Sequence, residues 1–65
     1  MVIFEVWDEG TYERRYYSTY EKAKEYVEYA YISPKFYGDE YETEVHDADG
    51  NMAWIRCHNL DPEIE

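Results

Sequence analysis

One segment of the sequence, residues 18–33, has the periodicity of an amphipathic helix, and segments that alternate like β-strands lie on both sides of it. Its apolar positions recur at helical spacing and are Tyr20, Ala23, Val27, Ala30 and Tyr31. The positions predicted to face solvent are Glu21, Lys22, Glu25, Glu28 and Tyr29. Ser18 and Glu21 match a capping box at the helix start, and Pro34 ends the helix because proline disfavours helical geometry in the residue before it. Since one helix covers only one face of a sheet, the other face must stay open.

Four segments are predicted to form strands. They are residues 2–7, 11–17, 41–46 and 52–57, each with the residue types or the alternation typical of a strand. In the third strand Tyr41, Thr43 and Val45 share one face, and Glu42, Glu44 and His46 share the other. Asp49 and Gly50 predict a two-residue type I′ turn, which would place His46 opposite Ala53. Residues 35–39 are predicted to be a loop whose aromatic side chains close one end of the core.

The predicted fold class is α+β, with one helix packed on one face of a small antiparallel sheet. The order is β-β-α-β-β, or β-α-β-β if residues 11–17 form only a loop. Residues 1–60 make a single domain, and residues 61–65 form an acidic tail that we expect to fray. The uncovered face carries Ile3 and Trp7, together with either the Met52 and Trp54 set or the Ala53, Ile55 and Cys57 set. An exposed apolar face of this kind is typical of an interface.

The chain is strongly acidic, with a net charge of −10 and only six Lys and Arg residues. Direct binding to nucleic acid is disfavoured because phosphate contacts require basic side chains, whereas a protein partner with a basic surface is favoured. Nine Tyr, two Trp and two Phe supply the large side chains of a folded core. Cys57 is the only cysteine, which excludes an intrachain disulfide. No apolar run approaches the roughly 20 residues of a membrane span, so we expect a soluble, cytoplasmic protein.

Catalytic and metal chemistry find little support in the sequence. His46, Cys57 and His58 are the soft metal ligands, but they lack the spacing of a zinc site. Residues 47–51, DADGN, lack the later acidic ligands of a calcium loop and are better explained as a hairpin turn. The carboxylates near residues 40–47 have no predicted cleft that would raise a pKa for glycosidase chemistry. We therefore expect neither an enzyme nor a cofactor.

Acidic residues alternate along the third predicted strand. On an extended strand Glu40, Glu42 and Glu44 would lie about 6.7 Å apart on one face, and Asp47 and Asp49 continue this line at the turn. Glu21, Glu25 and Glu28 form a second line on the helix. Such rows either imitate nucleic-acid phosphates for a basic groove or are simply a solvated surface. The residues predicted to bind a partner are Glu40, Tyr41, Glu42, Glu44, Asp47, Asp49, Trp7 and Trp54.

Residues 17–31, YSTYEKAKEYVEYAY, follow a short strand and precede an acidic hairpin, an arrangement that resembles short proteins of phages and bacteria. The size, acidity and tyrosine content are similar to those of phage-encoded host-takeover and anti-defence proteins, some of which are DNA mimics. The resemblance implies an inhibitor or modulator, acting in the host cytoplasm, that engages a basic surface of a nucleic-acid-handling protein. Arg14 and Arg15 depart from the most uniformly acidic mimics. The alternative is a homodimeric assembly protein whose uncovered sheet face pairs with itself around Trp7, Trp54 and Ile55.

Overall fold

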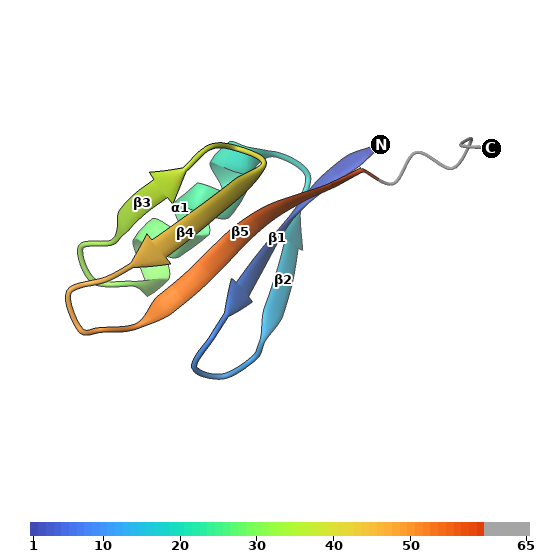
Figure 1. The fold of residues 1–65 in the computed structure, drawn as a ribbon. Helices are drawn as coiled ribbons and strands as arrows, with labels where there is room; N and C mark the ends of the chain where they lie inside the picture. Colours follow the sequence, from blue (N-terminus) through green and yellow to red (C-terminus); the bar gives the residue numbers. More distant parts are fainter. Residues whose placement is uncertain (60–65) are drawn as a thin grey trace.

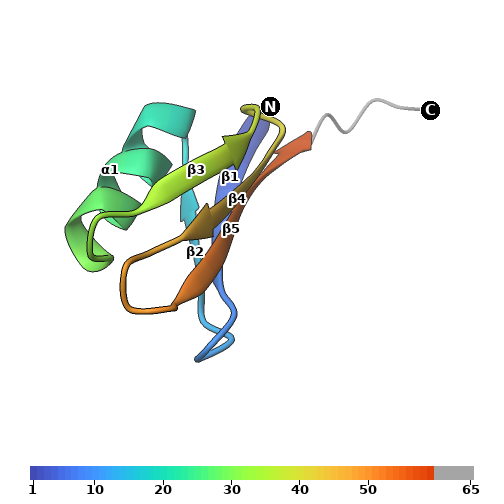
Figure 2. The ribbon, with the colours of Figure 1, turned by 60° about the vertical axis from the view of Figure 1, so that its left-hand side comes forward.

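Within residues 1–59, which the computed structural model describes, five strands form one antiparallel sheet and a single helix packs on one of its faces (Figures 1 and 2). The elements are β1 (Val2–Asp8), β2 (Arg14–Tyr17), α1 (Tyr20–Ala30), β3 (Lys35–Gly38), β4 (Glu42–His46) and β5 (Met52–Asn59). The strands are arranged in the order β2-β1-β5-β4-β3, so the first and last strands pair in the middle of the sheet. The α+β class is confirmed, and the acidic tail predicted at residues 61–65 lies outside the described residues.

The prediction of a loop over residues 35–39 was wrong, because Lys35–Gly38 forms the edge strand β3. It pairs with β4 with Phe36 opposite Val45, and Phe36 packs against the core. Pro34 precedes the strand, and Gly38 ends it with a φ of 111°, so these two residues bound a short strand. The element order is therefore β-β-α-β-β-β, and β2, though shorter than predicted, is a strand rather than a loop.

Helix α1 is capped by Thr19 and not by Ser18. Thr19 has an extended backbone, and its Oγ1 accepts a hydrogen bond from the Lys22 N–H at 3.1 Å. The helix ends at Ala30, earlier than Pro34 predicts, because Tyr31 has an extended backbone, with φ −115° and ψ 152°. This backbone turns the Tyr31 side chain into the core, where it is 8% exposed. Ala30, predicted to face the core, is exposed instead.

The turn between β4 and β5 differs by one residue from the predicted type I′ turn. His46 lies opposite Met52, and Val45 lies opposite Ala53. The Gly50 N–H donates to the Asp47 carbonyl and Gly50 has a φ of 85°, which is the pattern of a three-residue hairpin loop that ends in a left-handed glycine. A one-residue change of register moves every side chain to the opposite face. This loop therefore turns Ala53 toward the helix.

The core lies between α1 and the central strands. Its buried apolar residues are Val6, Ala23, Val27, Tyr31, Val45, Ala53 and Ile55. Thr43 is also buried, and its hydroxyl shares a 3.0 Å hydrogen bond with the Tyr20 hydroxyl, which ties the start of the helix to β4. Among the described residues, no helix is long and apolar enough to cross a membrane.

Candidate protein-binding surfaces

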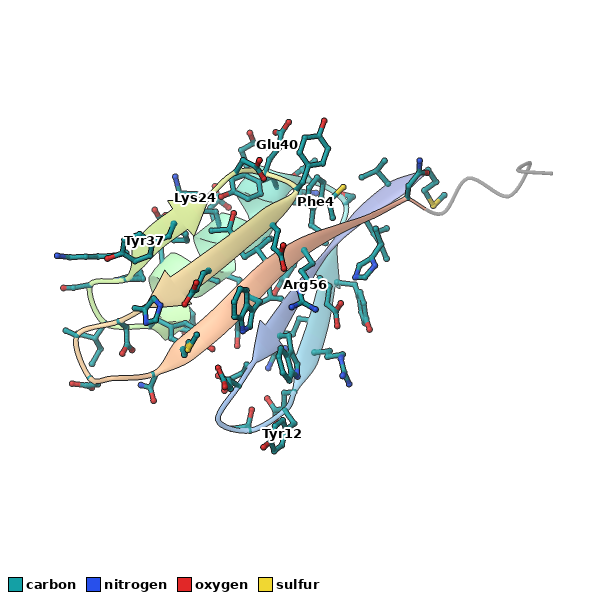
Figure 3. All side chains as sticks on the ribbon, in the orientation of Figure 1. Phe4, Tyr12, Lys24, Tyr37, Glu40 and Arg56 are labelled. Carbon is teal, nitrogen blue, oxygen red and sulfur yellow. The ribbon has the colours of Figure 1, made fainter. Side chains whose placement is uncertain are left out.

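The face of the sheet opposite α1 carries alternate residues of every strand. The register places them in rows that run across the sheet. One row consists of Arg14, Trp7, Trp54, Glu44 and Tyr37, and the next row consists of Tyr16, Glu5, Arg56 and Glu42. We call these side chains, together with Ile3, Lys35, His46, Met52 and His58, the open face. In Figure 3, Arg56 lies over the middle of the sheet on the side away from the helix.

Glu5 is the buried carboxylate of the open face. It is only 9% exposed, although it lies on the side of the sheet that the helix does not cover. Its carboxylate oxygens lie 2.9 Å from Arg14 Nε and 2.6 Å from His58 Nε2. A buried carboxylate needs such partners because loss of hydration is otherwise costly. These contacts join β2, β1 and β5 across the centre of the face.

The other acidic side chains of the open face also have partners. Glu42 Oε2 lies 3.3 Å from Arg56 Nε, and Glu44 Oε2 lies 2.6 Å from His46 Nε2. The face carries three carboxylates, on Glu5, Glu42 and Glu44, and three cationic side chains, on Arg14, Lys35 and Arg56. With both histidines neutral, the open face therefore has no net charge, in a chain whose net charge is −10.

Aromatic side chains occupy the middle of this face. Trp7 and Trp54 lie directly opposite each other on β1 and β5. The guanidinium of Arg14 lies 5.8 Å from the Trp7 ring centroid, and that of Arg56 lies 5.3 Å from the Trp54 ring, both within cation–π range. Tyr12, at a φ of 61° in the β1–β2 loop, stacks on Trp7 with ring centroids 6.2 Å apart. Trp, Tyr and Arg are the residue types that dominate binding energy at protein interfaces.

The Trp7 indole N–H has no acceptor among the described residues, although the nitrogen is buried. Beside it the open face is hollowed by about 160 Å³, in a space lined by Glu5, Trp7, Arg14 and Arg56. A buried donor without an acceptor costs about 1–3 kcal/mol unless water or a ligand supplies the missing bond. The hollow is lined by charged side chains around Trp7, and the indole nitrogen itself is not exposed to it.

The unbalanced acidity is concentrated at one end of the sheet. There the β1–β2 and β4–β5 loops lie at the same end of the sheet (Figure 1), and the Glu9 N–H donates to the Met52 carbonyl at 3.0 Å. The carboxylates of these loops and of the adjoining strand ends are those of Asp8, Glu9, Glu13, Asp47 and Asp49. We call this group the acidic end.

Two carboxylates of the acidic end are held in the charged form by the loops. Partial burial raises the pKa of Asp8, but hydrogen bonds from the Tyr31 hydroxyl and from the Thr11 and Gly10 N–H groups outweigh it, and the net pKa lies below the usual value. Desolvation is likewise outweighed at Asp47, where hydrogen bonds from Asn51 and from other backbone N–H groups lower the pKa. Both groups are therefore ionised at neutral pH.

The predicted partner-binding residues fall into three places. Trp7, Trp54 and Glu44 share one row of the open face, and Glu42 lies in the next row. Asp47 and Asp49 belong to the acidic end. Glu40 and Tyr41 are exposed in the β3–β4 loop at the opposite end of the sheet (Figure 3). The expected line of Glu40, Glu42 and Glu44 is broken, because β4 begins only at Glu42.

Sequence reasoning missed the charged residues of the open face around the tryptophans, namely Glu5, Arg14 and Arg56. The alternation of β1 already placed Glu5 beside Trp7, and that was the available signal. The two arginines could not be assigned to the same face because the register of β2 and β5 was unknown.

The residues considered for metal binding are separated by the fold. Cys57 lies opposite Phe4, whose side chain packs against the core, whereas His58 lies on the open face. His46 lies opposite Met52, five residues from Cys57 along β5. In residues 1–59 no group of three or more His, Cys, Asp and Glu side chains is placed to hold a metal ion. The Asp47 carboxylate is used by the hairpin, since it accepts from the Asp49 and Asn51 N–H groups at 2.9 and 2.7 Å.

In comparisons with known proteins, no family model, no curated protein and no solved structure matches the chain.

Proposed function

We propose that the chain is a small acidic protein-binding module that engages a basic surface of a partner protein through its acidic end. The observation that supports this proposal is the separation of charge over the fold. The open face is balanced, whereas the acidic end gathers five carboxylates. Among the described residues, the ion pair found at this end is that of Arg15 with Glu13, whose charged atoms lie 4.0 Å apart.

A concentrated negative field attracts a basic surface over several ångströms and raises the rate of encounter. The loops hold two of these carboxylates in place, because Asp8 and Asp47 accept backbone hydrogen bonds within their own loops. Carboxylates held in this way resemble the phosphates that a nucleic-acid-handling protein binds. The partner class is therefore the one implied by the phage-type resemblance, namely a host protein with a basic groove, and the chain would inhibit or modulate it in the cytoplasm.

The experiment uses the immobilised chain to capture partners from an extract of the cells that carry it. A double variant, Glu9→Gln with Asp49→Asn, removes two exposed charges from the acidic end without changing side-chain size. The matched control, Glu25→Gln with Glu28→Gln, makes the same change of net charge on the exposed side of α1. We expect the first variant to weaken capture of a basic protein about fivefold, or about 1 kcal/mol for two exposed charges, and the control to weaken it less.

Salt gives a second readout. Between about 0.1 M and about 1 M NaCl the Debye length falls from about 10 Å to about 3 Å, so the captured protein should be released. Glu42→Gln with Glu44→Gln should have a smaller effect than the acidic-end variant, because these carboxylates already contact Arg56 and His46 on a face without net charge. Equal losses in the acidic-end and helix variants, or a partner retained at high salt, would contradict the proposal.

A further inference from the structure

The open face is neutral and aromatic in a chain that is otherwise acidic, and this contrast points to what covers it. We infer that a second copy of the chain docks face to face on the open face and forms a homodimer. The inference is independent of the acidic end, which such a dimer leaves exposed.

Electrostatics favours this arrangement over other contacts between two copies. Away from the open face, the described carboxylates are those of Asp8, Glu9, Glu13, Glu21, Glu25, Glu28, Asp39, Glu40, Asp47 and Asp49, and the cations are Arg15, Lys22 and Lys24. Contact through any of these surfaces brings like charges together. Contact through the open face places the acidic surfaces on the outside, at the largest separation. A basic heterologous partner would instead be drawn to the acidic end, where the field is strongest.

The open face also has the composition that self-pairing requires. In a twofold dimer the same patch serves both subunits, so any charge or hydrogen-bonding group on it needs its complement on that same patch. The row Glu5, Arg56, Glu42 alternates in sign across three adjacent strands. Trp7 and Trp54 lie in the neighbouring row, opposite each other on β1 and β5, and supply the apolar contact area at the middle of the face.

The area of the face sets the expected strength. Five strands about 4.8 Å apart and about six residues of β5 give a face of roughly 24 by 20 Å, so pairing covers about 1,000 Å² over both copies. This area is at the lower limit for a specific interface, so the dimer should dissociate reversibly in the micromolar range.

The full chain carries its own reporter, because both of its tryptophans lie on the open face. Sedimentation equilibrium should give the mass of a dimer at about 100 µM, and dilution to about 1 µM should change the tryptophan emission as Trp7 and Trp54 become hydrated. Added salt should strengthen the dimer, because each copy carries a net charge of −10 and the two repel each other. Salt weakens binding to a basic partner, so the two contacts respond in opposite directions.

Two arginines form a matched pair of variants. Arg56 lies over Trp54 beside Glu42 on the open face, and Arg15 lies over Tyr26 on the helix side. Arg56→Glu should weaken dimerisation about tenfold or more, whereas Arg15→Glu, with the same change of net charge, should change it less than about twofold. If circular dichroism shows that Arg56→Glu is unfolded, Tyr37→Ser at the rim of the open face is compared with Tyr29→Ser on the helix exterior.

A wild-type chain that stays monomeric up to about 1 mM, or equal losses in the Arg56 and Arg15 variants, would overturn the inference and leave the open face to a different protein. A monomer that still captures a basic partner in a salt-sensitive way would leave the proposed function standing. A dimer that captures no basic partner would contradict the proposed function and leave the homodimer standing.

Discussion

The hydroxyl of Tyr31 joins the end of helix α1 to the end of strand β1, because it donates a hydrogen bond to the Asp8 carboxylate. The Tyr31 ring belongs to the buried core, where it is 8% exposed. Tyr31→Phe keeps the ring and removes only the donor. The change therefore measures the link between helix and sheet without creating a cavity.

The structure gives the size of the expected loss. A hydrogen bond to a charged group contributes about 1.5–3 kcal/mol, and the low end applies because Asp8 keeps its bonds from the Gly10 and Thr11 N–H groups. We expect about 1–2 kcal/mol. For 65 residues the entropy of unfolding is about 0.14 kcal/mol/K, so the Tm should fall by about 7–15 °C. The loss is large beside the roughly 3–10 kcal/mol that a chain of this length has in total.

Thermal unfolding followed by circular dichroism measures this loss at neutral pH. Tyr29→Phe is the matched control, because Tyr29 lies on the same helix and is 89% exposed, so its Tm should stay within about 4 °C of the wild type. A Tyr31→Phe chain that melts with the wild type would show that the hydroxyl bond adds nothing to stability, and the reasoning would be wrong.

The difference between wild type and Tyr31→Phe should depend on pH. Hydrogen bonds hold the pKa of Asp8 low against the opposing effect of burial, so its contribution is present above its unfolded pKa of about 3.9 and is lost as pH falls through the folded value. Burial, and then the bond to Asp8, raises the pKa of Tyr31. The contribution of the Tyr31 hydroxyl to stability is therefore complete below about pH 10 and is lost as the pH rises above it. The difference in Tm should therefore be largest between about pH 4 and pH 10. A constant difference across this range and beyond it would contradict the assignment.

Two further variants test local features by urea unfolding. Thr19→Ala should destabilise the chain by about 1 kcal/mol through loss of the helix cap, whereas Ser18→Ala should be close to neutral; the opposite ranking would restore the capping box predicted from sequence. Gly38→Ala should cost about 2 kcal/mol or more, because the residue has positive φ and an added Cβ would overlap the Glu42 carbonyl. Gly50→Ala has positive φ but open space around it, so about 1 kcal/mol is expected; equal costs at the two glycines would refute the steric part of the explanation.

Local patterns predicted most of the elements, because each pattern reflects burial on one side of a short segment. The helical spacing of Ala23 and Val27 was correct, and both are buried; Tyr31 is buried too, but through the extended backbone that follows the helix. The alternation that placed Thr43 and Val45 on one face of their strand was also correct, because both residues are buried. Strand β3 was missed because Pro34 and Gly38 indicate a turn, whereas pairing with β4 supplies the backbone hydrogen bonds that a four-residue segment cannot provide for itself.

The candidate surfaces depended on information that no single segment contains. The sequence showed the acidity and the tryptophans, but it suggested that Glu42 and Glu44 were free charges. In the fold Glu42 contacts Arg56, because β5 pairs with β4 in a register set by the Asp47–Asn51 loop, and Glu44 contacts His46 two residues along the same strand. The acidic end, in turn, exists because two loops distant in sequence meet where β1 and β5 pair.

Periodicity and composition are properties of each segment alone, so they were enough to predict one helix on one face of an antiparallel sheet in a strongly acidic chain. The residues that the uncovered face presents depend instead on how the strands pair in the folded chain. A shift of one residue in the β4–β5 hairpin exchanges the two faces of β5, and with them Trp54 and Ile55. Strand register, and not composition, thus separates a neutral aromatic face from an acidic end in the same small chain.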